Sequence, residues 1–396
     1  MASAVRLLVA TWGIVCLLVA AACAQPAAPS NLGVSGSPAG PPVSIVFLEA
    51  GTAATYGIEF WDSTTGSVTS DSGVVHTGPR SLKLSGGVAT ATRRAWAFPT
   101  VAGRVSFYYQ LAAVPTDNNN NVIDLQSFFT TPEFSLSIRD TGILRAYTNN
   151  MGTQLGSDGP TLATGQWYLI VIAFTITSTT VNEWRVWVDG TLAITGANAT
   201  LSRDDIEDIR LLERTHTAYY SDIYADDSSS LTDPGDIRVT AKLPASVNTG
   251  NFDTTGGTGA VNERALSETN YMQHAATTDV QQNYTLQTAA VGDVDISTGV
   301  TLVGRSAWIW AKGAAGGAGT PKIMDNGSES AVVLTSAAKL FTVLTTSASY
   351  PSNAAGIGMR STNDADDTLL YECGTLIAYT PAAGAAGNPY YAYQQQ

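Results

Sequence analysis

Acidic side chains are the first place to look for chemistry in this sequence, because a pair of carboxyl groups can cleave a glycosidic bond. Retaining glycosidases hold the two carboxyl groups about 5–5.5 Å apart, and alternate residues of one strand point to the same face. No Glu-x-Asp-x-x-Glu spacing occurs here, and we interpret the acidic run at 204–208 as a solvated loop before a strand at 209–212. In a secreted hydrolase or lyase, Asp204, Glu207 and Asp222 would be the residues to test.

Nucleophilic and metal-dependent catalysis lack their usual patterns as well. The sequence has no Gly-x-Ser-x-Gly turn for a nucleophilic serine. Its histidines, His76, His216 and His274, have neither the His-x-His nor the His-x-x-x-His spacing of a metal site. A phosphate-binding loop and a dinucleotide fingerprint are missing too. We therefore expect that the protein is not an enzyme.

Oxygen-bearing side chains suggest calcium as the one ion for which the sequence offers ligands. The run at 117–121 includes Asp117 and Asn119, and a second group is formed by Asp222 and Asp226. No twelve-residue calcium loop is present, and we interpret the asparagine run as a solvated hairpin tip, with calcium binding as the alternative. We expect no other cofactor.

Aromatic side chains are the candidates for binding a sugar ring by stacking. The candidate ligand-binding residues are Trp187, Trp61, Tyr219 and Tyr220. Alternation places Trp187 on the face opposite Val186 and Val188. The alternative is that these aromatic residues belong to the core, where such side chains are common.

The elements that must position these residues are β-strands. Apolar residues alternate along 105–111 and 134–138, and 167–177 is almost continuously apolar, as expected of a central strand. Asp189-Gly190 between two apolar runs indicates a two-residue hairpin. No helical periodicity of comparable length is found, so the sequence predicts an all-β protein.

Composition limits the classes of partner. The chain has 396 residues and a net charge of −13, with 20 basic against 33 acidic residues. Nucleic acid requires clusters of basic residues, so we expect no nucleic acid among the partners. Only 13% of the residues are charged and 44% are hydrophobic, which is enough for a substantial core and excludes disorder.

The N-terminus is typical of an export signal. Residues 1–24 combine Arg6, an apolar run and Ala-Cys-Ala at 22–24, which suits cleavage before Gln25. Lipidation of Cys23 or a retained anchor are the alternatives. Cleavage or lipidation leaves Cys373 as the cysteine of the body, where we expect a buried thiol. The expected location is a virion surface, the extracellular space or the cell envelope.

The body is predicted to form two β-sandwich, jelly-roll-like domains joined by a short polar linker, because each sheet needs a second layer to cover its apolar face. The expected order is a signal-like segment at 1–24, a Pro/Gly-rich linker at 25–43, domains at 44–228 and 229–381, and a flexible tail at 382–396.

Several passages carry a resemblance to known families. The segments at 78–84, 165–168, 184–190 and 221–227 resemble the concanavalin A-like jelly roll in its laminin-G-like form. The part at 233–380, beginning with Asp-Pro-Gly-Asp-Ile-Arg-Val, is similar to a region that follows such domains in tailed-phage virion proteins. The resemblance implies a structural or adhesive surface protein.

The function expected from the sequence is therefore a non-catalytic virion component of a phage, such as a head fibre, decoration or tail protein. The alternative is a secreted or lipid-anchored glycan-binding protein of a bacterial envelope. Expected partners are other virion or cell-surface proteins and glycans, and we expect a homo-oligomer. A secreted hydrolase or lyase is the third hypothesis.

Overall fold

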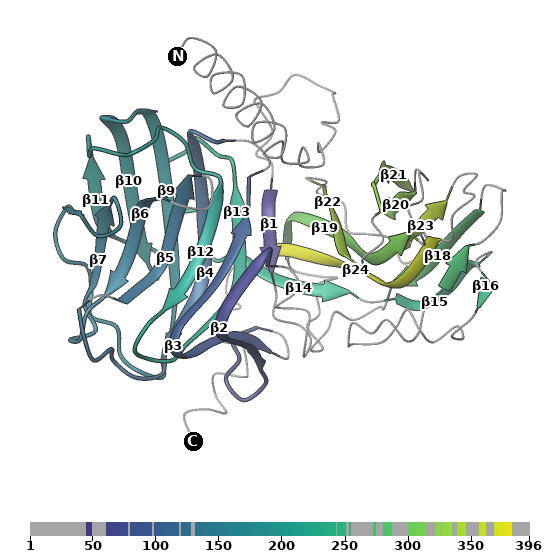
Figure 1. Ribbon diagram of the computed structural model, residues 1–396, viewed down its shortest axis with the longest axis horizontal. Coiled ribbons are helices and arrows are strands. Elements are labelled where there is room, and N and C mark those ends of the chain that lie inside the picture. The colour runs from purple at the N-terminus through teal and green to yellow at the C-terminus, as the bar shows by residue number, and fades with distance from the viewer. Residues whose placement is uncertain are drawn as a thin grey trace, which may run out of the picture. The chain divides into compact units, whose positions relative to one another are not determined.

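A computed structural model describes most of the body of the chain (Figure 1). The described residues are 45–49, 61–77, 80–96, 99–118, 120–127, 131–242, 244–250, 253–254, 272–274, 280–286, 300–313, 321–325, 327–334, 339–345, 356–361 and 368–381. All regular elements in these ranges are strands, paired antiparallel, so the all-β prediction is confirmed. We find among them no helical segment with the length and apolarity that a membrane span requires. The predicted boundaries at 24, 43, 228 and 381 stay predictions.

Thirteen strands up to residue 226 form one folded sheet. They are β1 (Ile45–Glu49), β2 (Ser63–Asp71), β3 (Ser81–Arg94), β4 (Ala102–Leu111), β5 (Asn120–Ser127), β6 (Thr131–Ile138), β7 (Leu144–Thr148), β8 (Thr153–Leu155), β9 (Trp167–Ser178), β10 (Val181–Val188), β11 (Thr191–Ala197), β12 (Asp208–Glu213) and β13 (Ala218–Asp226). The order is β11-β10-β9-β4-β13-β3-β12-β5-β6-β7-β8, with β1 on β13 and β2 on β3.

Strand β13 joins the two layers of this sandwich, because it pairs with β4 of one layer and with β3 of the other. The apolar core lies between the layers. Phe134 of β6 stacks on Trp184 of β10 with ring centroids 4.9 Å apart, and Trp184 in turn stacks on Phe174 of β9. The alternating residues at 105, 107, 109 and 111 all belong to this core, as predicted.

The Asp189-Gly190 hairpin is confirmed between β10 and β11. Both residues have positive φ angles, 49° and 75°. Two consecutive left-handed residues match the right-handed twist of the flanking strands, and aspartate and glycine are suited to these positions.

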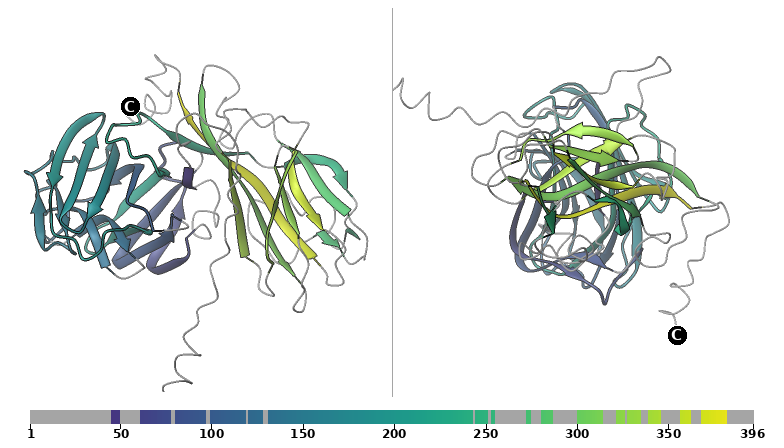
Figure 2. Two further views of the ribbon diagram at one scale, coloured as in Figure 1. Left: turned by 90° about the horizontal axis from the view of Figure 1, so that it is seen from above. Right: turned by 90° about the vertical axis from the view of Figure 1, so that its right-hand side faces the viewer.

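The remaining strands form two smaller sheets, which occupy the green to yellow part of the colour range in Figure 2. One contains β14 (Arg238–Lys242), β16 (Asp253–Thr254), β17 (Met272–His274), β19 (Thr301–Gly313), β22 (Lys339–Thr345) and β24 (Thr368–Thr380), and the other contains β15 (Pro244–Gly250), β18 (Val280–Leu286), β20 (Lys322–Asp325), β21 (Ser328–Ala331) and β23 (Ile357–Ser361). A shared apolar cluster, which includes Ile309 and Met359, packs between them. Cys373 is buried in this cluster, as predicted.

Two sequence interpretations near the ends of strands are wrong. Glu207 and Asp208 are buried, and Asp208 begins β12, so this part of the acidic run is not a solvated loop. Asn120 is fully buried in β5. Its amide donates to the backbone oxygen of Asp117 and its oxygen accepts from the backbone of Thr215, so its polar atoms are satisfied without water. The asparagine run is therefore not a solvated tip at Asn120.

Replacing Gly156 with alanine should destabilise the edge of the sandwich where β8 meets β11. A Cβ at Gly156 would lie 2.2 Å from the backbone oxygen of Thr195, and its φ angle is +61°. We expect a loss of about 1–3 kcal/mol from this overlap, in addition to about 1 kcal/mol for the left-handed backbone. Gly165→Ala is the control, because its φ angle is +75° and no atom lies within 4 Å of its Cβ position. Equal unfolding free energies of the two variants in urea would contradict the expectation.

Candidate functional site

Polar side chains form a row across the outer face of the layer that contains β3, β12, β5, β6, β7 and β8. In each strand the core residues alternate with the residues of this row. The strand register places the following side by side: Thr92, Arg210, Asp124, Ser135, Tyr147 and Gln154. Adjacent to this row, Asp208 lies beside Gln126, and Asn121, Ser137 and Arg145 lie across from one another. We call this set the polar face.

An arginine and a carboxylate anchor the centre of the polar face. The guanidinium of Arg210 donates to Oδ2 of Asp124 through Nε at 3.0 Å and also through Nη2. The amide of Asn121 donates to Oδ1 of Asp124 at 2.8 Å. Asp124 is fully buried, so these donors hold its carboxylate in one orientation and in turn fix Arg210 over β5.

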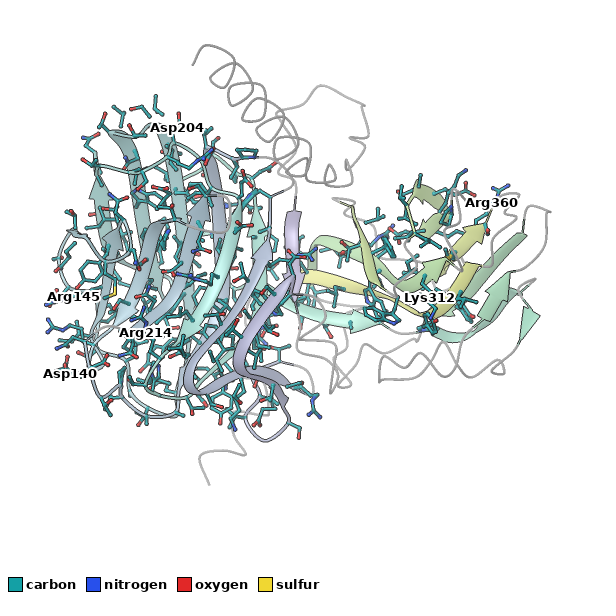
Figure 3. The ribbon with its side chains drawn as sticks, viewed as in Figure 1. Asp140, Arg145, Asp204, Arg214, Lys312 and Arg360 are labelled. Atoms are coloured by element: carbon teal, nitrogen blue, oxygen red, sulfur yellow. The ribbon has the colours of Figure 1, made fainter. Side chains whose placement is uncertain are left out.

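A second arginine lies at the β7 side of the polar face, where Figure 3 labels it. Arg145 donates to Asp158 at 2.6 Å, and Gln154 donates to the other oxygen of Asp158 at 3.0 Å. Hydrogen bonds with Asp158 and with the phenol of Tyr147 raise the pKa of Arg145 above its ordinary value. Tyr147 is therefore in contact with a permanently charged guanidinium.

Several neutral polar groups of the face are buried without a hydrogen-bond partner in the described structure. They are Oδ1 of Asn121, Oε1 and Nε2 of Gln126, Oγ of Ser135 and Oγ of Ser137, and on the same face the charged Nε of Arg145 is also buried without a partner. Burying such a group unpaired costs about 1–3 kcal/mol. The two serines have the shortest side chains of their rows and lie between longer neighbours, and their oxygens are buried.

The aromatic residues proposed from the sequence lie elsewhere. Trp187 is on the face opposite Val186 and Val188, as predicted, and packs with Tyr219 on the outer side of the other layer. Trp61 and Tyr220 belong to the sandwich core. All four side chains are at least nine-tenths buried. Their role in binding a sugar stays a prediction.

Three of the proposed calcium ligands are held by partners within the protein. Asp222 accepts hydrogen bonds from Ser221 and from the backbone of Val239, and Asp226 binds Arg104. Asp117 accepts from Asn120, and Asn119 lies outside the described residues. No group of three or more His, Cys, Asp or Glu side chains suited to a metal ion occurs in the described ranges. The calcium prediction is not tested further by this geometry.

A buried cluster of titratable residues lies inside the sandwich at the end of β12. Glu213 accepts from the hydroxyls of Tyr220 at 2.8 Å and Tyr109 at 3.3 Å, and it contacts Nε2 of His216 at 2.5 Å. Burial raises the pKa of Glu213, against the lowering effect of His216 and of the tyrosine hydroxyls. Because its members are buried and bind one another, we assign the cluster to the stability of the fold.

The raised pKa of Glu213 predicts how stability changes with pH. The folded-state pKa of Glu213 exceeds the unfolded value of about 4.3. The protonated carboxyl therefore contributes fully to the free energy of unfolding below about pH 4.3, and this contribution is lost as pH rises through the folded-state pKa. Glu213→Gln is uncharged at every pH and keeps an acceptor. We therefore expect the free energy of unfolding of the variant, relative to that of the parent, to be higher at about pH 7 than at about pH 4. Denaturant unfolding at both pH values measures this, and an unchanged or reversed difference would contradict it.

Comparisons with known proteins find solved structures that resemble part of this chain, but they find no family to which it is assigned. No family model and no curated protein sequence matches the chain. Among solved structures, an endo-β-1,4-glucuronan lyase of the fungus Trichoderma reesei matches with 13% identity and a TM-score of 0.37, over 47% of this chain and 96% of the lyase. A carbohydrate esterase of the Shiga toxin-encoding bacteriophage phi24B has 12% identity and a TM-score of 0.36, over 47% of this chain and all of the esterase. A sialidase of Trypanosoma rangeli has 14% identity and a TM-score of 0.32, over 52% of this chain and 34% of the sialidase.

These comparisons correct two expectations from the sequence. The protein was expected to be a non-catalytic structural or adhesive component of a virion, or a glycan-binding protein, and not an enzyme. The similar structures are instead all-β domains of enzymes that act on sugars, a lyase, an esterase and a sialidase. The expectation relied on missing linear motifs, whereas the residues of the polar face come from six strands.

Proposed function

We propose that this protein is a carbohydrate-active enzyme whose polysaccharide substrate lies across the polar face. The observation that carries the proposal is the row from Thr92 to Gln154, a continuous line of polar side chains across six strands. A polysaccharide offers hydroxyl groups at regular intervals, and each hydroxyl both donates and accepts a hydrogen bond. Such a ligand would find accessible partners in the longer side chains of the row, among them Tyr147, Gln154 and Arg210.

Tyr147 is the residue that we assign to proton transfer. Its phenol lies on the polar face and forms a hydrogen bond with the guanidinium of Arg145. Arg210 supplies donors on the opposite side of Ser135, where they can hold a sugar oxygen. Asp124 and Asn121 act as positioning residues, because they orient Arg210.

Two finer expectations belong to the same proposal. We propose that 44–228 is a concanavalin A-like jelly roll that carries the polar face, and that the leader exports the enzyme to the polysaccharide. A phage origin is a separate proposal, which the neighbouring genes would test. Mass spectrometry of the mature N-terminus tests the export.

The function is tested by incubating the full chain with a panel of polysaccharides and reading three products. Absorbance of unsaturated sugars reports elimination, new reducing ends report hydrolysis, and free acetate reports deacylation. We expect one of these products, and a loss of about 10²–10⁴-fold in turnover for Tyr147→Phe, the usual range for a general acid or base. Tyr379→Phe on β24 is the matched control and should keep full activity.

Two results would overturn the proposal. The first is the absence of all three products from a folded chain, as judged by circular dichroism. The second is full activity of Tyr147→Phe, because this change removes the hydroxyl that we assign to proton transfer.

A further inference from the structure

We infer that residues 198–205, which we call the rim, border the substrate site and that Arg203 of the rim contacts the polysaccharide. The inference rests on the proposed function and names a specificity-determining residue of the same site. The rim runs from β11 of one layer toward β12 of the other, and it includes Asp204, which Figure 3 labels. It contains neither strand nor helix, so its shape depends on the side chains that hold it.

The beginning of the rim is fixed to the core of the sandwich. The side chain of Asn182 on β10 donates to the backbone oxygen of Ala199 at 2.7 Å and accepts from its backbone nitrogen at 3.2 Å. The backbone nitrogen of Leu201 donates to the backbone oxygen of Thr179 at 2.8 Å. Ala199 and Leu201 both belong to the apolar core. Loops are usually more mobile than the strands they connect, whereas this one is anchored.

The middle of the rim is bound to the polar face through Glu133 of β6. Glu133 alternates with the core residue Phe134, so it points outward as Ser135 does. It is nevertheless fully buried, because the rim covers it: Oε2 accepts from the backbone nitrogen of Ser202 at 2.7 Å, and the backbone of Arg203 also donates to this carboxylate. Glu133 and Ser135 are two residues apart, about 7 Å along the strand. The rim therefore lies against the polar face beside Ser135.

A second anchor is the residue that follows β7. The amide of Asn149 donates to the backbone oxygen of Thr200 at 2.7 Å, and its Oδ1 accepts from Oγ of Ser202 at 3.0 Å. The φ angle of Asn149 is 50°, which asparagine tolerates better than most residues. Tyr147, which we assign to proton transfer, precedes Asn149 by two residues. The rim is thus tied to the same end of the polar face from β6 and from β7.

Arg203 is the rim residue that we assign to substrate contact. Its side chain is 53% exposed, and its Nε lies 3.4 Å from Oδ1 of Asp205. Burial raises the pKa of Glu133, and the nearby charge of Asp205 adds to that rise. Asp205 and its arginine partner therefore lie at the end of the polar face that Glu133 occupies. A guanidinium that is open to solvent can donate to a sugar oxygen, whether that oxygen belongs to a hydroxyl or to a carboxylate.

The inference is tested with Arg203→Ala in the full chain, on the polysaccharide from which the parent makes product. A contact away from the reacting bond binds the substrate and the transition state alike, so its loss raises KM and leaves kcat unchanged. We expect KM to rise about tenfold or more, the effect of losing one hydrogen bond to a charged group. Because Arg203 is more than half exposed, the variant should fold like the parent.

The matched control is Arg185→Ala, which makes the same change in charge on the other layer and should leave KM and kcat as they are. An unchanged KM for Arg203→Ala, or an equal rise in the control, would overturn this inference and leave the proposed function intact. No product from any polymer with the parent chain would overturn both.

The anchors are tested separately, because we infer that they position Arg203 without touching the substrate. Glu133→Ala removes the acceptor of two rim amides, so we expect faster hydrogen exchange at Ser202 and Arg203 together with a raised KM. Glu133→Gln keeps an oxygen acceptor and should restore most of both. Asn149→Ala, which loses the bonds to Thr200 and Ser202, serves as the test if Glu133→Ala does not fold.

A double variant shows whether an anchor acts through Arg203. Combining Glu133→Ala, or Asn149→Ala in its place, with Arg203→Ala should raise KM no further than the larger single effect, because both changes remove the same contact. Effects on KM that multiply, or unchanged exchange of the rim amides in the anchor variant, would overturn the positioning role.

Discussion

Replacing Arg104 with alanine is expected to lower the free energy of unfolding by about 3–5 kcal/mol, because it leaves a buried carboxylate without its counter-charge. Asp226 is fully buried at the end of β13, and Nε of Arg104 lies 3.1 Å from both of its oxygens. A second guanidinium nitrogen lies 2.6 Å from Oδ2. The hydroxyl of Tyr224 and the backbone of Ser228 donate to the same carboxylate, but neither supplies a charge.

The control for this variant is a solvent-exposed ion pair. Arg185 and Glu183 are also 2.6 Å apart, but both side chains are more than one-third exposed. Exposed pairs contribute about 0–1 kcal/mol, so Arg185→Ala should unfold close to the parent chain in urea. A cost for Arg104→Ala no greater than that for Arg185→Ala would show that Asp226 does not depend on its partner.

Replacing Asp222 with alanine is expected to cost at least about 3 kcal/mol. Its carboxylate lies 2.8 Å from Nδ1 of His76 and accepts from the hydroxyl of Ser221 at 2.9 Å and from the backbone of Val239 at 2.8 Å. Removing an acceptor from a buried donor costs about 1–3 kcal/mol. The φ angle of Asp222 is +53°, which aspartate tolerates better than alanine.

Two companion variants separate the parts of this effect. Asp222→Asn keeps an acceptor and the tolerance for positive φ, so we expect it to lose less stability than the alanine variant. Hydrogen exchange should also show faster opening of the amide of Val239 in Asp222→Ala, because that amide loses its carboxylate partner. Unchanged protection of Val239 would mean that the contact with Asp222 does not hold β14.

Local patterns in the sequence predicted the faces of strands correctly but not the neighbours of each strand. The alternation at 134–138 placed Phe134 in the core and Ser135 outside, as observed, and Asp189-Gly190 gave the hairpin. These signals depend on residues that are adjacent in the chain, so their physical cause is visible in the sequence. The contact between Arg210 and Asp124 joins residues 86 positions apart, and no local pattern specifies it.

The candidate site was missed for the same reason. Serines at 135 and 137, and the arginine and tyrosine at 145 and 147, are unremarkable as single strands with one polar face. They become a candidate site only because β12 lies between β3 and β5 and brings Arg210 into the row beside Asp124. The acidic run at 204–208 misled in the same way, since the sequence alone does not reveal that its last residue is paired inside a sheet.

The place of β12 in the sheet also determines the order of events during synthesis. Strands β3 and β5 end at residues 94 and 127, yet the strand that fills the space between them begins at residue 208. Pairings between such distant segments are slow, because a long loop must close before they form. During synthesis, the edges of β3 and β5 that pair with β12 stay unpaired until β12 has left the ribosome. A protein truncated before residue 208 would keep both edges unpaired and would be prone to aggregate through them.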